Sequence, residues 1–81
     1  MTKTMIQKNI RLAHEFDTYV ARSARALNSV PNGSNVILTT SSDEKLSEAN
    51  LSIVRSSRAG KFVVAHKTSK GWSIKPLGKT R

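Results

Sequence analysis

Apolar residues recur at steps of three and four along the first third of the chain. They occupy seven positions: Ile6, Ile10, Ala13, Phe16, Val20, Ala24 and Leu27. Met5, Leu12 and Tyr19 flank this stripe and widen it. This spacing predicts an amphipathic helix over residues 4–29 that buries one stripe. Pro31 and the pair Asn32 and Gly33 should end it, because Pro cannot continue a helix and Asn-Gly favours a tight turn with positive φ.

A short β-branched run follows this turn. Residues 35–40 read NVILTT, and their near-continuous apolar centre predicts a strand that is covered on both faces.

A second helix is predicted over residues 42–58. Ser41 and Glu44 fit a capping box at its start, and Gly60 can adopt the left-handed conformation that closes a helix. Its buried face should consist of Leu46, Ala49, Ile53 and Val54.

The last apolar segments predict a β-hairpin. Residues 62–64 open one strand, and Trp72, Ile74 and Leu77 alternate with polar or Pro positions in the other. Residues 68–71 join the two strands through a polar, basic tip.

These elements predict an α+β fold in the order α-β-α-β-β, with two helices packed on a small sheet and a parallel crossover through the second helix. A winged-helix-like fold is the alternative, because it also ends in a hairpin. If residues 2–8 were a strand instead, the order βαβαββ would resemble that of small Alba-type chromatin proteins and of the C-terminal domain of translation initiation factor three. We expect one domain over residues 1–77 and a mobile basic tail over residues 78–81.

The distribution of charge suggests a polyanionic partner. Fourteen Lys and Arg against five Asp and Glu give a net charge of +9, and no acidic residue follows Glu48. One-signed charge over so much of a small chain indicates selection for nucleic acid or another anionic surface. We therefore predict a non-enzymatic accessory or regulatory protein that binds duplex DNA in preference to RNA and can form a homodimer. The predicted binding residues are Arg55, Arg58, Lys61, Lys67, Thr68, Ser69, Lys70, Lys75, Lys79 and Arg81.

Each of these predictions competes with a structural explanation. The residues at the hairpin tip can be polar only because turns are exposed, and Arg55 and Arg58 can serve to neutralise a helix C-terminus. On the first helix, Arg11, Arg22 and Arg25 fall near Lys8 on the face opposite the apolar stripe. This face is expected to be solvated, with Arg11 paired to Glu15 four residues later. Trp72 can stack on a base, but its alternation with Ile74 favours a packing role.

Two other functions remain open at this point. A small ribonuclease or toxin would need a general acid and base, and His14 and His66 with nearby cations are the candidates for that pair. An inhibitor or assembly factor that binds an acidic protein would select the same Lys and Arg residues.

Composition excludes several kinds of site. The chain has no cysteine, which excludes disulfides, thiolate catalysis and cysteine-ligated zinc, and it has no acidic set spaced for a metal. Neither a cofactor nor a metal is expected. The apolar runs are too short to span a membrane, so we expect a cytoplasmic protein, associated with the nucleoid if it is bacterial.

Overall fold

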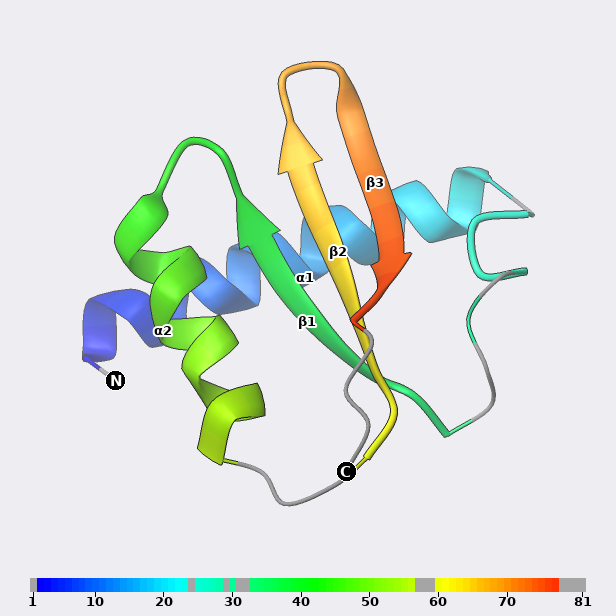
Figure 1. The fold of residues 1–81 in the computed structure, drawn as a ribbon. Coiled ribbons are helices and arrows are strands. Elements are labelled where there is room, and N and C mark those ends of the chain that lie inside the picture. Colours follow the sequence, from blue (N-terminus) through cyan, green and yellow to red (C-terminus); the bar gives the residue numbers. More distant parts are fainter. Residues whose placement is uncertain (1, 24, 29, 31–32, 57–59, 78–81) are drawn as a thin grey trace.

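The computed structural model describes residues 2–23, 25–28, 30, 33–56 and 60–77. Its elements are α1 (Lys3–Arg22), β1 (Asn35–Thr40), α2 (Glu44–Ser56), β2 (Phe62–Thr68) and β3 (Gly71–Pro76) (Figure 1). The predicted α+β class, the order of elements and the C-terminal hairpin are confirmed.

The three strands form one mixed sheet in the order β1-β2-β3. β1 runs parallel to β2, and β2 runs antiparallel to β3. Among the described residues between β1 and β2 the only helix is α2, so the winged-helix alternative, which needs two helices there, is wrong. Residues 3–22 are helical, so the alternative with an additional N-terminal strand is also wrong.

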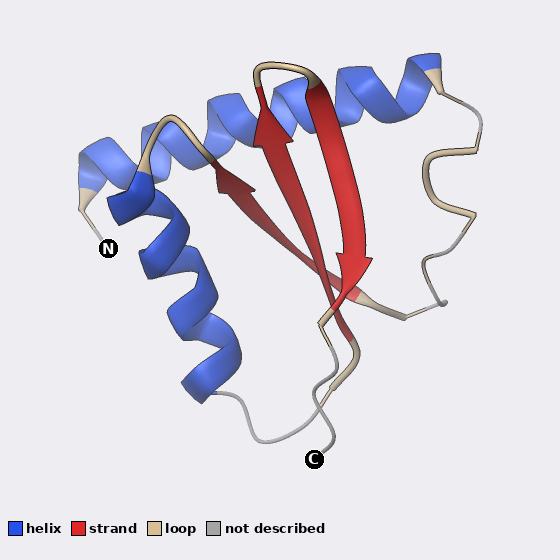
Figure 2. Cartoon of the chain, turned by 45° about the horizontal axis from the view of Figure 1, so that its top comes forward, coloured by secondary structure: helices blue, strands red, loops and turns tan. Residues whose placement is uncertain are grey.

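The two helices pack on opposite faces of the sheet, and the N-terminal half of α1 extends past β1 to contact α2 directly (Figures 1 and 2). On one face α1 crosses the strands, and the ring of Phe16 meets that of Trp72 edge-on with centroids 5.1 Å apart. On the other face Val54 of α2 joins Ile37 and Phe62 in the buried core. Because α2 lies beside β1, it leaves the β3 side of this face uncovered (Figure 2).

α1 is shorter than predicted. Ser23 leaves the helical conformation, with φ −124° and ψ 95°, and its N–H bonds to the carbonyl of Val20 at 3.2 Å. By its last turn α1 has passed the edge of the sheet (Figure 2), so further turns would find no apolar surface to cover. Most helical stability comes from such packing, which explains why the prediction up to residue 29 was wrong.

The buried face of α1 also differs from the predicted stripe. Leu12 and Phe16 are buried, whereas Ile6 and Ile10 are exposed. α1 carries two neighbouring apolar rows, and the sheet covers only the row that contains Leu12 and Phe16. The prediction placed Ile6 and Ile10 at the centre of the stripe and Leu12 only at its flank, and in the structure this order is reversed.

The N-terminal cap of α2 differs from the predicted one. The carboxylate of Asp43 accepts the N–H of Leu46 at 3.1 Å, so Asp43 caps the helix and the proposed capping box of Ser41 and Glu44 is wrong. The predicted end at residue 58 lies outside the described residues.

The buried side of α2 contains a polar residue. It consists of Leu46, Asn50 and Val54, while Ile53, which we expected inside, is exposed. Asn50 is buried because it bonds to α1 and to β1, which no pattern within α2 reveals.

Side chains of α2 form hydrogen bonds with the backbone along the edge of β1 that none of the described strands pairs. Ser47 Oγ accepts the N–H of Thr40 at 2.9 Å and donates to its carbonyl at 3.0 Å, and Asn50 Nδ2 donates to the carbonyl of Leu38 at 2.8 Å. These side chains satisfy backbone groups that a second strand would otherwise pair.

Candidate nucleic-acid interface

The turn of the β2–β3 hairpin and the loop between β1 and α2 lie at the same end of the molecule (Figures 1 and 2). We call this the hairpin end. The N–H of Ser41 donates to the carbonyl of Lys67 at 3.0 Å and so joins the end of β1 to the end of β2. The parallel pairing of these two strands is what brings their carboxyl ends together.

A cleft of about 220 Å³ opens at this end, between α1 and the start of α2. Its polar lining consists of three cations, two carboxylates and two hydroxyls. The lining residues are Lys8, Arg11, Leu12, Glu15, Thr40, Ser42, Asp43, Leu46 and Lys67.

Two ion pairs cross the cleft. Lys8 Nζ lies 2.9 Å from Asp43 Oδ2, and Lys67 Nζ contacts Glu15 Oε1. The hydrogen bond from Lys8, together with the N–H of Leu46, lowers the pKa of Asp43 below its usual value. Both pairs are solvent-accessible, so they position the side chains more than they stabilise the fold.

Arg11 has no ion-pair partner among the described residues. The expected pairing of Arg11 with Glu15 is wrong, because Glu15 contacts Lys67, which is 52 positions away in the sequence. Arg11 is left exposed at the rim of the cleft, with its guanidinium available to an anion.

The hairpin turn is held by its own side chains. Thr68 Oγ1 accepts the N–H of Lys70 at 3.2 Å and donates to the carbonyl of Gly71 at 3.3 Å. Gly71 has φ 130°, a conformation that residues with a Cβ rarely adopt. The turn therefore presents Ser69 and Lys70 to solvent on a fixed backbone.

The structure brings together only part of the predicted binding set. Lys67, Thr68, Ser69 and Lys70 share the hairpin end. Lys75 lies on β3, but the register pairs it with Val64 while Lys67 pairs with Trp72, so the side chains of Lys75 and Lys67 point to opposite faces of the sheet.

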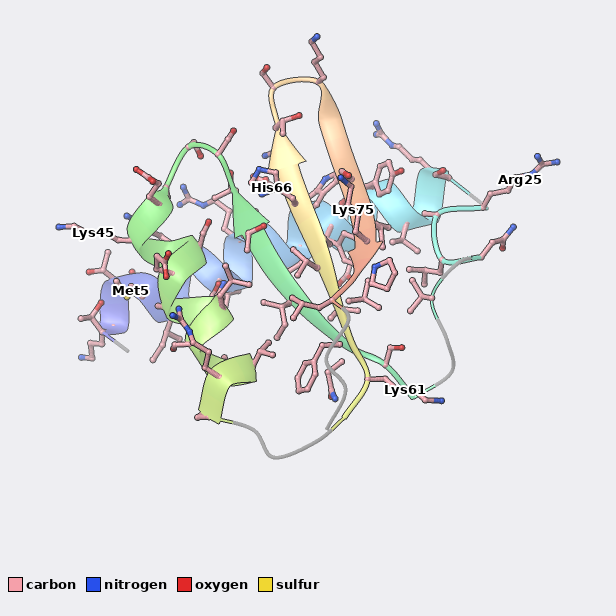
Figure 3. All side chains as sticks on the ribbon, in the orientation of Figure 1. Met5, Arg25, Lys45, Lys61, His66 and Lys75 are labelled. Atoms are coloured by element: carbon pink, nitrogen blue, oxygen red, sulfur yellow. The ribbon has the colours of Figure 1, made fainter. Side chains whose placement is uncertain are left out.

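Other predicted residues lie elsewhere. Lys61 precedes β2 and sits at the far end of the sheet (Figure 3), roughly 20 Å from the turn at about 3.3 Å per residue. Arg55 is in the last turn of α2, where its Nη2 lies 3.0 Å from Glu48 Oε2. Arg58, Lys79 and Arg81 lie outside the described residues.

Sequence reasoning missed the role of Lys8 and Arg11 in this surface. It grouped them with Arg22 and Arg25 on the solvated face of the first helix. Their spacing of three residues shows that they are neighbours on α1, but only the crossing of α1 over the sheet places them beside Lys67.

The two histidines do not belong to one site. His66 Nδ1 and Thr39 Oγ1 are 2.6 Å apart on the face of the sheet that packs α2. His14 is exposed on α1, which covers the opposite face. The sheet thus separates the acid and base that the ribonuclease hypothesis would pair.

The aromatic residues form a packing cluster. Besides the contact of Trp72 with Phe16, the ring centroids of Trp72 and Tyr19 are 6.4 Å apart. The rings of Phe16 and Tyr19 stack with their centroids 6.4 Å apart. The packing role predicted for Trp72 is confirmed, and this cluster holds α1 against β3.

No group of three His, Asp or Glu able to hold a metal occurs among the described residues. None of the helices described is long and apolar enough to cross a membrane.

Comparison with known proteins identifies a family. Residues 4–75 match a family of unknown function (DUF5647). The chain belongs to this family. The match runs from the first turn of α1 to the end of β3 and so includes both helices and the sheet. Comparisons with curated proteins and with solved structures gave no significant match.

Proposed function

We propose that this protein binds duplex DNA through its hairpin end and acts as a non-enzymatic accessory or regulatory factor. The observation that carries the proposal is the separation of charge between elements. All five acidic residues lie on α1, on α2 or at Asp43, which caps α2. The strands, the hairpin and the remaining segments carry eight cations and no carboxylate.

The shape of the hairpin supports duplex DNA in particular. A two-stranded ribbon is one of the elements that the major groove of B-form DNA, about 12 Å wide, can admit. The major groove of A-form RNA is deep and narrow and excludes such a ribbon. In the proposed complex the exposed Lys70 of the turn enters the groove, and Arg11 of the cleft lining contacts a flanking phosphate.

The experiment is a titration of a labelled DNA duplex at several salt concentrations. Since each neutralised phosphate releases counterions, log K should fall with log salt at a slope of about 0.9 per phosphate contact. Lys70→Ala should weaken binding and reduce the slope by about one. Lys61→Ala is the matched control, because it removes the same charge from an exposed lysine at the other end of the sheet.

If Lys70→Ala and Lys61→Ala weakened DNA binding equally, the net charge of the protein would account for binding and the hairpin end would not be the binding surface. An interaction independent of salt would contradict the proposal altogether. A matched RNA duplex should bind more weakly than the DNA. In this proposal the protein acts in the cytoplasm, at the nucleoid if the cell is bacterial.

A further inference from the structure

A patch of exposed aliphatic side chains lies away from the hairpin end. Ile10 of α1 is 66% exposed, Ile6 49%, Ile53 of α2 46% and Val36 of β1 37%. We call these four residues the apolar patch. They come from three elements that are far apart in sequence.

A groove of about 170 Å³ forms the centre of the apolar patch. It is lined by Asn9, Val36, Ile37, Leu38, Asn50 and Ile53. Ile6 and Ile10 do not line the groove, but they lie one turn apart on the same side of α1 and next to Asn9, which does line it. The patch therefore combines a hollow with projecting side chains next to it.

Folding of the single chain does not account for this patch. Scattered exposed aliphatic residues are normal, but neighbouring ones around a groove are typical of an interface. The row of α1 that includes Ile6 and Ile10 stays exposed, since the sheet packs Leu12 and Phe16 instead.

The charge around the patch indicates what covers it. The two helices, with Asp43, carry six cations and five carboxylates, whereas the eight other cations have no acidic residue in their elements. A polyanion would be drawn to those eight cations and gains little from a nearly neutral apolar surface. A second copy of a chain with charge +9 can approach this side with the least repulsion.

The shape of the patch is also self-complementary. In a two-fold dimer each contact occurs twice, so one surface must supply both the projection and the hollow that receives it. The apolar patch supplies Ile10 as the projection and the groove between β1 and α2 as the hollow. We propose that the protein forms a symmetric dimer in which Ile10 of each copy enters this groove of the other.

Sedimentation equilibrium over a micromolar to millimolar range tests the proposal without DNA. We expect reversible dimerisation, and Ile10→Lys should raise the dimer dissociation constant by at least about tenfold. Leu27→Lys is the matched control, because Leu27 is also a large exposed apolar residue, at 43%, but follows α1 at the end opposite to Ile6 and Ile10. It should leave the constant unchanged.

Two further measurements guard against misfolding and locate the contact. Ile6→Lys should act like Ile10→Lys, and far-UV circular dichroism should show that both variants keep the wild-type helix content. Because the chain has no cysteine, a mixture of Ile10→Cys and Ile53→Cys variants should form a cross-linked heterodimer on mild oxidation, whereas Leu27→Cys should not cross-link to either.

A monomer at every concentration would overturn the proposal. So would a dimer that resists Ile10→Lys, or one in which positions 10 and 53 fail to cross-link. The dimer and DNA binding are tested separately, because sedimentation without DNA measures the effect of Ile10→Lys and the DNA titration measures that of Lys70→Ala.

Discussion

The hydrogen bonds of Asn50 provide the sharpest test of how α2 is placed. Asn50 is 6% exposed, and its Nδ2 donates to the carbonyl of Leu38 and to Asn9 Oδ1, both at 2.8 Å. Its Oδ1 accepts from Asn9 Nδ2 at 3.0 Å. One side chain thus ties α2 to β1 and to α1.

Asn50→Ala removes all three bonds and leaves the carbonyl of Leu38 without this donor. At a net contribution of about 0.5–1.5 kcal/mol per hydrogen bond, the free energy of unfolding should fall by about 2–4 kcal/mol. A chain of 81 residues has a total stability of only about 4–12 kcal/mol, so the loss is large. Asn9→Ala removes two of the bonds but spares the one to Leu38, and should cost about 1–3 kcal/mol.

Urea denaturation followed by circular dichroism measures these changes. Asn28→Ala is the control, because Asn28 is exposed in the turn after α1 and its replacement should change stability by less than about 0.5 kcal/mol. The double variant of Asn9 and Asn50 should be clearly less destabilised than the sum of the two single variants. An Asn50→Ala protein as stable as the Asn28→Ala protein would refute this account of α2.

Three further predictions concern single contacts. Asp43→Ala should lower the melting temperature, whereas Asp43→Asn should keep the helix cap. Because the pKa of Asp43 is lowered in the folded state, its carboxylate stabilises the fold above its unfolded pKa, and this stabilisation should fade as the pH drops below about 4. The melting temperature should therefore fall less on acidification in Asp43→Asn than in the wild type. Trp72→Ala should destabilise by about 3 kcal/mol in urea and Trp72→Phe by less, since the ring packs against α1, and equal losses would contradict this role. Gly60→Ala should cost about 1 kcal/mol or more by thermal melting, because φ is +149° and the new Cβ would lie 3.1 Å from the ring of Phe62; a neutral substitution would show that the backbone relaxes.

Much of the candidate site could be read from the sequence, but only where its residues are local. The turn residues 68–71 and the cations beside them follow from the hairpin pattern and the absence of acidic residues after Glu48. The cleft could not be read in this way. Its contacts join Lys8 to Asp43 and Glu15 to Lys67, pairs that are 35 and 52 positions apart.

By itself, the sequence determined the elements and their order. Hydrophobic periods of about 3.6 and 2 residues, interrupted by Pro and Gly, depend on interactions between near neighbours and so are visible in the chain. The same holds for the excess of cations outside the helices.

Only the tertiary structure decided which apolar row of α1 is buried, where α1 ends and why Asn50 of α2 is inside. A helix period marks an apolar side, but two adjacent rows satisfy it almost equally well. The angle at which α1 crosses the sheet chooses Leu12 and Phe16, and that angle depends on Trp72, Asn50 and other residues far along the chain. The exposed row of Ile6 and Ile10 is the consequence, and with it the surface that we assign to the dimer.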